Sequence, residues 1–253
     1  GDWVQVYRAG DVIPKVADVD LSRRNIHAQP FEFPHLCPEC GSEAIREEGD
    51  AVRRCTGGLI CPAQAVEKLK HFVSRHAFDI EGLGDKRIEF FHALEDEHLS
   101  IRTPVDIFTL ARRESLGLNR LSNFPGFGAT SVRNLFESIE ARRRIDLHRL
   151  IFGLGIRHIG EGNAKLLARA YGSWDHFYDA MKKAADRDPE TLAELGAIDG
   201  VGAVVVEALT DFFGEDHNRA AIDALLREIT PLDAEAPVTT DSPVAGKTVV
   251  FTG

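Results

Sequence analysis

A glycine-centred pattern recurs four times along the 253-residue chain and constrains its fold more than any other feature. The anchors of the pattern are spaced 44, 32 and 42 residues apart, at Gly84, Gly128, Gly160 and Gly202. Each anchor has apolar residues one and four positions before it, and four and seven positions after it. The two later positions share one face of a helix that starts just past the glycine. The pattern therefore predicts four helices, each beginning at its anchor.

A second glycine stands two residues before the anchor in three copies, at Gly82, Gly126 and Gly200, whereas the third copy has His158. Glycine tolerates a positive φ and lets another backbone approach closely. Such a turn is expected to bury its middle residue between two helices. The arrangement resembles the helix-hairpin-helix motif. Alternate anchors are 76 and 74 residues apart, which predicts two paired units.

The turns predict phosphate binding without recognition of base sequence. Backbone N–H groups at a helix N-terminus point outward and carry partial positive charge, so they can hold a DNA phosphate oxygen. The alternative is that the turns only connect packed helices. The candidate DNA-binding residues lie in and beside the turns: Gly82, Gly84, Lys86, Arg87, Gly126, Gly128, Thr130, Arg133, Arg157, His158, Gly160, Lys165, Gly200 and Gly202. The fourth copy continues with Val204 and Val205 in an acidic surrounding, so it is expected mainly to pack.

The charge balance argues against a protein that coats nucleic acid through bulk positive charge. The chain has 30 Lys and Arg against 40 Asp and Glu, a net charge of −10. Residues 133–170 form a net-basic block with 8 basic and 4 acidic side chains, including Arg142, Arg143 and Arg144. This block could form an anion-facing stripe. It could equally be a solvated helix face with pairs such as Glu140 and Arg144.

All four cysteines lie within one window, at Cys37, Cys40, Cys55 and Cys61. A C-x2-C turn lets two thiolates reach one ion, and a second pair some 15 residues on completes a tetrahedral four-sulfur site for Zn²⁺. A pair of disulfides is the alternative, which an intracellular chain without other cysteines disfavours. Four thiolates leave no position for water, so the metal is predicted to be structural rather than catalytic.

The ends of the chain indicate strands cut out of a longer protein. Residues 2–8 and 12–16 predict two short strands joined at Gly10 and Asp11. A Pro- and Ala-containing linker over 230–243 precedes a further predicted strand at 246–253. No run of about 18 apolar residues and no secretory signal occurs, so the chain is expected to be soluble and intracellular.

Taken in order, these features resemble the C-terminal half of a bacterial NAD-dependent DNA ligase. The resemblance is carried by the segment Arg8 to Pro14, the four cysteines, Cys61-Pro62-Ala63-Gln64, Asp79 to Gly84 and Leu154 to Gly160. It implies a mainly α fold that follows a partial β segment. The implied domains are the end of an oligonucleotide-binding (OB) fold, a four-cysteine zinc finger, a helix-hairpin-helix domain, a linker and the start of a BRCT domain, over residues 1–30, 31–66, 67–229, 230–243 and 244–253. Arg8 and Lys15 are candidate DNA contacts of the OB fold.

The resemblance also implies an activity for the full-length protein. In this family a lysine in a Lys-x-Asp-Gly motif is adenylated from NAD, with Mg²⁺ or Mn²⁺ as metal, and nicks in duplex DNA are sealed during replication and repair. No such motif occurs here, because Asp199-Gly200 follows Ala197-Ile198, so no catalytic residue is assigned. The chain itself is expected to bind nicked double-stranded DNA as a monomer, without NAD or Mg²⁺, in the bacterial cytoplasm at the nucleoid.

Three other functions remain open from the residues alone. A non-enzymatic module that binds DNA junctions could use paired hairpins, but has no need of the four cysteines. A nuclease or excision-repair protein would need clustered carboxylates for metal ions, whereas Asp186, Asp188 and Glu190 are more typical of a solvated face. A scaffold with an acidic C-terminal block would not bind DNA in a salt-dependent way.

Because the adenylation motif is absent, we expect that incubation with adenylate-labelled NAD leaves this chain unlabelled. Gel autoradiography after denaturation measures this directly. A covalently labelled chain would show that an unrecognised nucleophile is present.

Overall fold

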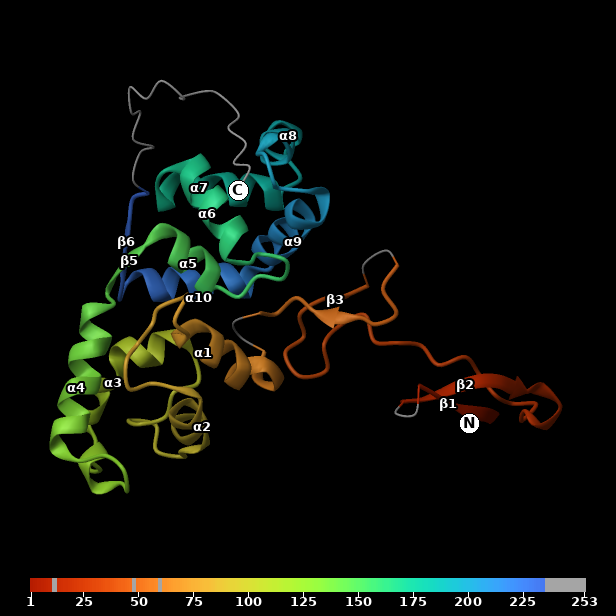
Figure 1. Ribbon diagram of the computed structural model, residues 1–253, viewed down its shortest axis with the longest axis horizontal. Helices are drawn as coiled ribbons and strands as arrows, with labels where there is room; N and C mark the ends of the chain where they lie inside the picture. Colours follow the sequence, from red (N-terminus) through yellow and green to blue (C-terminus); the bar gives the residue numbers. More distant parts are fainter. Residues whose placement is uncertain (11–12, 47–48, 59–60, 235–253) are drawn as a thin grey trace, which may run out of the picture. The chain divides into compact units, whose positions relative to one another are not determined.

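The computed structural model describes residues 1–10, 13–46, 49–58 and 61–234, and every structural statement below concerns those residues. The chain divides into two compact units, residues 1–34 and residues 35–253. Helices dominate the second unit, which confirms the predicted mainly α fold (Figure 1).

The first unit is an antiparallel ribbon. Its strands are β1 (Trp3–Ala9) and β2 (Ile13–Asp20), followed by a short 3-10 helix, η1 (Leu21–Arg23). The register shifts between Gln5 and Val6, and Gly10 at the turn has a φ of 58°. Both predicted strands are therefore confirmed, and the second is longer than expected. Arg8 and Lys15 are exposed on neighbouring strands.

The second unit begins with the cysteine-bearing segment. Two short antiparallel strands, β3 (Ala44–Ile45) and β4 (Arg54–Cys55), precede a 3-10 turn, η2 (Pro62–Gln64), and the helix α1 (Ala65–Val73). Pro62 stands at the first position of η2, where its missing N–H costs no hydrogen bond.

The glycine repeats follow as two pairs of hairpins. The first pair contains α2 (Asp85–Ala93), α3 (Pro104–Leu116), η3 (Leu121–Asn123) and α4 (Ala129–Ala141). The second pair contains α5 (Leu147–Gly153), α6 (Glu161–Tyr171), α7 (Trp174–Ala185), α8 (Pro189–Ala197), α9 (Ala203–Gly214) and α10 (Asp216–Leu226). The anchors Gly84, Gly128, Gly160 and Gly202 are the N-caps of α2, α4, α6 and α9, so all four predicted helix starts are confirmed.

A parallel strand pair joins the middle of the chain to its end. β5 (Arg144–Asp146) pairs with β6 (Thr230–Leu232), and the two lie side by side in Figure 1. The start of the predicted 230–243 linker is therefore a strand. Thr230 N–H donates to Arg143 O at 2.6 Å, and Pro231, which has no N–H, is tolerated because the pair has only two strands. Residues 235–243 and the predicted BRCT start, 244–253, lie outside the described residues.

The apolar positions of the glycine pattern build the core. The middle residues of the four turns, Leu83, Phe127, Ile159 and Val201, are at most 5% exposed. The apolar residues at four and seven positions beyond each anchor are buried in the same cluster, apart from Val206, which is half-buried against it. The repeats therefore share one continuous core.

Two arginines of the basic block, Arg142 and Arg143, bond to other parts of the protein. Arg142 donates to the backbone oxygen and the carboxylate of Asp79, and Arg143 pairs with Glu140 and Glu228. The predicted Glu140–Arg144 pair is wrong, because α4 ends at Ala141 and Arg144 enters β5.

Among the described residues, none of the helices combines the length and the apolar character that a membrane span requires.

The middle residue of a turn should matter far more for stability than an exposed leucine. Leu83→Ala removes a side chain that is 0% exposed and should lower the free energy of unfolding by about 2–5 kcal/mol. Leu118→Ala, at a side chain that is 100% exposed, is the matched control and should change it by about 0.5 kcal/mol or less. Urea denaturation measures both, and equal effects would contradict the assigned core.

Candidate metal centre and nucleic-acid interface

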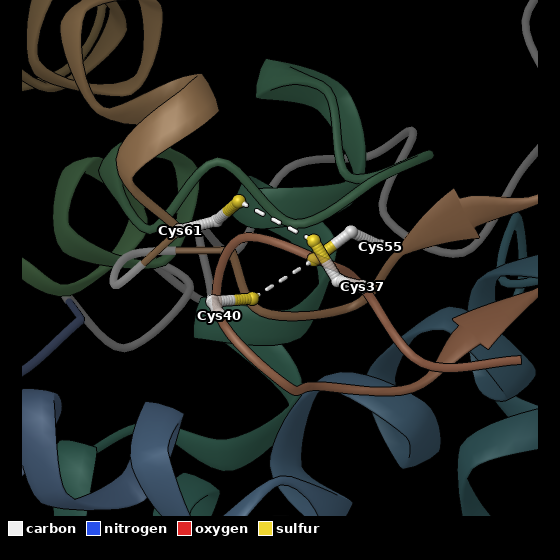
Figure 2. A group of neighbouring side chains, drawn as sticks. All are labelled: Cys37, Cys40, Cys55 and Cys61. Carbon is white, nitrogen blue, oxygen red and sulfur yellow. Dashed lines mark hydrogen bonds between the residues drawn. The ribbon is translucent and has the colours of Figure 1, made fainter. Parts of the chain in front are cut away.

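The four cysteines converge to one point in space. Their sulfur atoms all lie within 4.8 Å of one another, and Figure 2 shows them turned toward a common centre. The Sγ atoms of Cys37 and Cys61 are 3.9 Å apart, and those of Cys40 and Cys55 are 3.4 Å apart. Four sulfurs at Zn–S bonds of about 2.3 Å stand roughly 3.8 Å from one another in a tetrahedron. The donor set therefore fits a tetrahedral zinc site.

Backbone groups prepare the thiols to act as ligands. The backbone N–H groups of Glu39 and Cys40 lower the pKa of Cys37 to about 7. The N–H of Gly57 donates to Cys55 Sγ at 3.2 Å. Burial, and to a lesser degree the neighbouring cysteines, raise the pKa values of Cys55 and Cys61, which disfavours a bare thiolate at either position. A divalent cation would reverse that preference, because a coordinating thiol loses its proton.

Two adjacent glycines, Gly57 and Gly58, let the backbone of the cysteine segment come close to neighbouring side chains. A Cβ on Gly57 would lie 2.5 Å from Ser42 Oγ and 2.8 Å from Cys40 Sγ. A Cβ on Gly58 would lie 2.8 Å from the ring of Phe212 on α9. The first glycine therefore permits the sulfur cluster, and the second permits its contact with the last hairpin.

The cysteine segment is hydrogen-bonded to the fourth hairpin. Glu215, between α9 and α10, accepts bonds from the backbone N–H of Glu43 and the hydroxyl of Thr56. Asn218, which is 0% exposed, donates to the backbone oxygens of Thr56 and Phe212. Thr56 follows the ligand Cys55 directly, so these two polar residues tie the metal site to the helices. Sequence reasoning missed both of them, because neither belongs to a motif.

The four glycine turns have nearly the same backbone. The residue two positions before the anchor has a positive φ in every copy: 82° at Gly82, 84° at Gly126, 63° at His158 and 88° at Gly200. The anchors are extended, with φ between −75° and −84°. His158 therefore takes the left-handed conformation that glycine takes elsewhere, and the third turn keeps its shape.

The helices that begin at these anchors have no side-chain cap. None of the four anchors offers a capping hydrogen bond to its helix, whereas α7 and α8 are capped by Ser173 and Asp188. The first N–H groups of a helix have no partner within it. The four hairpin helices thus begin with N–H donors that no capping side chain accepts, a property that α1, α5 and α10 share.

No protein atom lies close to the space that a side chain at each of the four anchors would occupy. All four anchor glycines are exposed, and a Cβ built on any of them meets no heavy atom within 4 Å. Neither internal packing nor a positive φ requires glycine at these positions. The missing side chain therefore clears room for another molecule beside the uncapped N–H groups.

The candidate side chains beside the turns divide into two groups. Lys86, Thr130 and Arg133 are exposed beside the first two turns, with Arg133 4.0 Å from Glu137. Lys165 is exposed beside the third turn but pairs with Glu161, whose pKa this hydrogen bond lowers. These four residues can reach a ligand on the turn surface.

Arg87 and Arg157 are instead engaged within the protein. Arg87 donates to Gly82 O and Ser131 Oγ, at 2.8 and 3.0 Å. Arg157 donates to Asp50 of the cysteine segment at 3.2 Å and lines a cavity of about 720 Å³ between that segment and α9. Each guanidinium joins its own hairpin to a neighbouring element.

The fourth turn, Gly200 to Gly202, differs from the others in its surroundings. Asp199 is exposed beside it and Val204 is exposed just beyond it, while Val205 is buried. A Cβ on Gly200 would lie 2.8 Å from Leu166 of the third hairpin. Glu215 and Asn218, beyond α9, add contacts to the cysteine segment. The anchor Gly202 is nevertheless as exposed as the other three, so a mainly packing role for this hairpin stays a prediction.

Comparison with known proteins identifies two sequence families in the chain. Residues 37–63 match the family described as the NAD-dependent DNA ligase C4 zinc finger domain. Residues 149–222, which hold the third and fourth turns, match a helix-hairpin-helix motif family.

Whole-chain similarity points the same way. The chain is 58% identical over 265 residues to a DNA ligase of Brucella melitensis biotype 1 and 58% identical over 261 residues to a DNA ligase of Brucella ovis. These matches cover 100% of this chain and 36% of each relative. The chain thus spans about a third of the length of the relatives it matches.

Removal of zinc should loosen the fourth hairpin as well as the cysteine segment. We expect a chelator to speed amide hydrogen exchange in residues 37–58 and in α10, because Thr56 is the shared attachment point. Amides of α2 and α4 should exchange as before. Native mass spectrometry should count one zinc per chain beforehand.

Asn218→Ala is the matched variant for this coupling. It leaves all four sulfurs in place but removes the donor to Thr56 O, which should cost about 1–3 kcal/mol of stability. It should reproduce the faster exchange in α10 while zinc stays bound. Unchanged exchange in α10 after both treatments would mean that the two parts are not coupled.

Proposed function

Because this chain belongs to the family of bacterial NAD-dependent DNA ligases, we propose that it is the part of such a ligase that grips duplex DNA around a nick. The whole protein would seal nicks during replication and repair, using NAD and Mg²⁺ or Mn²⁺ at residues that this chain does not supply. The contribution of this chain would be binding and orientation rather than bond making.

The observation that carries the proposal is the set of uncapped, exposed helix N-termini at Gly84, Gly128 and Gly160. Each presents backbone N–H groups and the positive end of a helix dipole beside open space. A phosphate oxygen suits that environment, because hydrogen bonds from N–H groups to an anion are stronger than those to a neutral acceptor. Backbone donors contact any sequence equally, and a nick has no fixed sequence.

This arrangement explains how an acidic chain could bind DNA. With a net charge of −10, long-range attraction does not favour association. The phosphate contacts would instead be local, supplied by the turns and by Lys86, Thr130, Arg133 and Lys165. The imidazole ring of His158 would be a further phosphate donor at the third turn. Gly200 and Gly202 would contribute least, because Asp199 stands exposed beside them.

The zinc site would serve this function through position alone. Cys37, Cys40, Cys55 and Cys61 would hold Zn²⁺ with no open coordination site. The ion would fix the loops that bond to Glu215 and Asn218 and so set the orientation of the cysteine segment on the hairpins.

Further proposals follow from the family. Residues 1–30 would end an OB fold that contacts DNA through Arg8 and Lys15, residues 31–66 would form the zinc finger, and residues 67–229 the hairpin domain. A linker and the start of a BRCT domain would follow. The protein would act as a monomer in the bacterial cytoplasm, at the nucleoid.

Adding a methyl group at an anchor should block DNA without harming the fold. Gly84→Ala and Gly128→Ala place a Cβ in open space at φ values that alanine adopts readily. Each should weaken binding to nicked duplex by about tenfold or more, since one hydrogen bond to a charged group contributes about 1.5–3 kcal/mol. Fluorescence anisotropy across a salt series measures the affinity.

Gly196→Ala is the control for these variants. It adds a methyl group in open space on α8, away from the anchors, and should leave the affinity unchanged. Intact duplex, single-stranded DNA and a four-way junction complete the comparison. Tighter binding to the junction than to nicked duplex would favour a junction-binding module, and anchor variants that bind like the unmodified chain would refute the proposed interface.

A further inference from the structure

Arg87 joins the first hairpin to the second. It lies three residues past Gly84, in the first turn of α2, and its guanidinium has three neighbours. Nη1 donates to Gly82 O in its own turn, and Nη2 donates to Ser131 Oγ on α4. The Cζ atom lies 4.7 Å from the ring centroid of Phe127, the middle residue of the second turn. One side chain thus contacts both phosphate-binding turns.

The residues that Arg87 contacts are part of the second turn itself. Phe127 directly precedes the anchor Gly128, and Ser131 lies three residues after it. A contact between a guanidinium and an aromatic face adds electrostatic attraction to the hydrogen bond. The bridge therefore restrains the start of α4 relative to the start of α2, where the two sets of uncapped N–H groups lie.

A second arginine braces the same pair at another point. Arg142, just beyond α4, donates to the backbone oxygen and carboxylate of Asp79, at 3.1 and 3.0 Å. Asp79 has a φ of 49° and leads into the first turn. Two polar bridges thus link these hairpins, and each runs from one hairpin to the other.

The second pair of hairpins lacks the equivalent of the Arg87 bridge. Asn163 occupies the same register, three residues past Gly160, and donates to His158 O at 2.8 Å, just as Arg87 donates to Gly82 O. The position that matches Ser131 is the buried Val205, which has no side-chain acceptor. Asn163 thus keeps the hydrogen bond within its own turn, and among the described residues of the two pairs the bond from this position to the next hairpin occurs in the first pair.

We propose that Arg87 is a positioning residue that holds the anchors Gly84 and Gly128 at the spacing of two DNA phosphates, and is not itself a phosphate ligand. This inference rests on the proposed DNA-binding function. Two sites held in register act as one bivalent surface, whereas sites that move independently lose affinity on being ordered. Loss of the bridge should lower affinity without removing any phosphate contact.

The salt dependence of binding separates a positioning residue from a ligand. Each lost phosphate contact reduces the slope of log affinity against log salt by about 0.9. Lys86→Gln should reduce the slope by that amount, because the exposed Lys86 neighbours Arg87 and has no bridging role. Arg87→Gln should weaken binding about five- to tenfold with the slope unchanged.

A double-mutant cycle tests the bridge directly. Ser131→Ala should weaken binding no more than Arg87→Gln does, and the double variant should bind like Arg87→Gln, because the hydrogen bond that Ser131→Ala removes is already lost with Arg87. Arg87→Lys keeps the charge but lacks the planar fork that reaches two acceptors, so it should behave like Arg87→Gln. If Arg87→Lys binds normally, or Arg87→Gln lowers the slope while Ser131→Ala has no effect, Arg87 is a phosphate ligand and the proposal is wrong.

Hydrogen exchange without DNA keeps this test separate from that of the proposed function. Amides of residues 128–133 should exchange faster in Arg87→Gln and Ser131→Ala than in Lys86→Gln. Exchange that is equal in all three overturns the bridge, whatever the DNA result. Faster exchange in a chain that binds no DNA would instead leave the bridge in place and refute the DNA-binding function.

Discussion

Each of the four turns buries its middle residue, which is apolar, and the rest of the structure depends on this burial. Leu83, Phe127, Ile159 and Val201 each insert into the core from a turn whose preceding residue has a positive φ. That insertion pulls the turn against the helices and aims the next helix outward with its first N–H groups uncapped. The same contact thus provides stability and orients the helix start at which we propose that a phosphate binds.

The repeats have been put to different uses despite this shared backbone. In the first pair, the side chains beyond the anchors are polar, and Arg87 and Arg142 brace one hairpin against the other. In the second pair, Leu166 packs against Gly200, and the last hairpin receives the cysteine segment through Glu215 and Asn218. A four-sulfur site is a compact way to order a loop-rich segment, because one ion replaces a hydrophobic core that so few residues could not build. The proposed DNA contacts thus lie on the first three hairpins, whereas support of the metal site comes from the fourth.

Several arginines of this protein bond to other parts of the protein. Arg142, Arg143 and Arg149 form a basic cluster in the sequence, yet their donors go to Asp79, Glu228 and backbone oxygens. An arginine can satisfy several carbonyls at once, which suits it to closing the ends of helices and turns. Binding would then depend on oriented backbone dipoles more than on net charge, in agreement with the overall charge of −10.

The local elements could be predicted from the sequence because each has a short-range cause. Glycine spacing and apolar periodicity specified the four turns and the face of each helix, and cysteine spacing specified the sulfur cluster. Tertiary structure alone decided which side chains bond within the protein and which remain available to a ligand. Arg87 and Lys86 are adjacent and both cationic, yet one bridges two hairpins and the other is exposed. Asn218, Glu215 and the strand at 230–232 likewise act through partners more than 80 residues away, and no local pattern records a partner that only folding brings near.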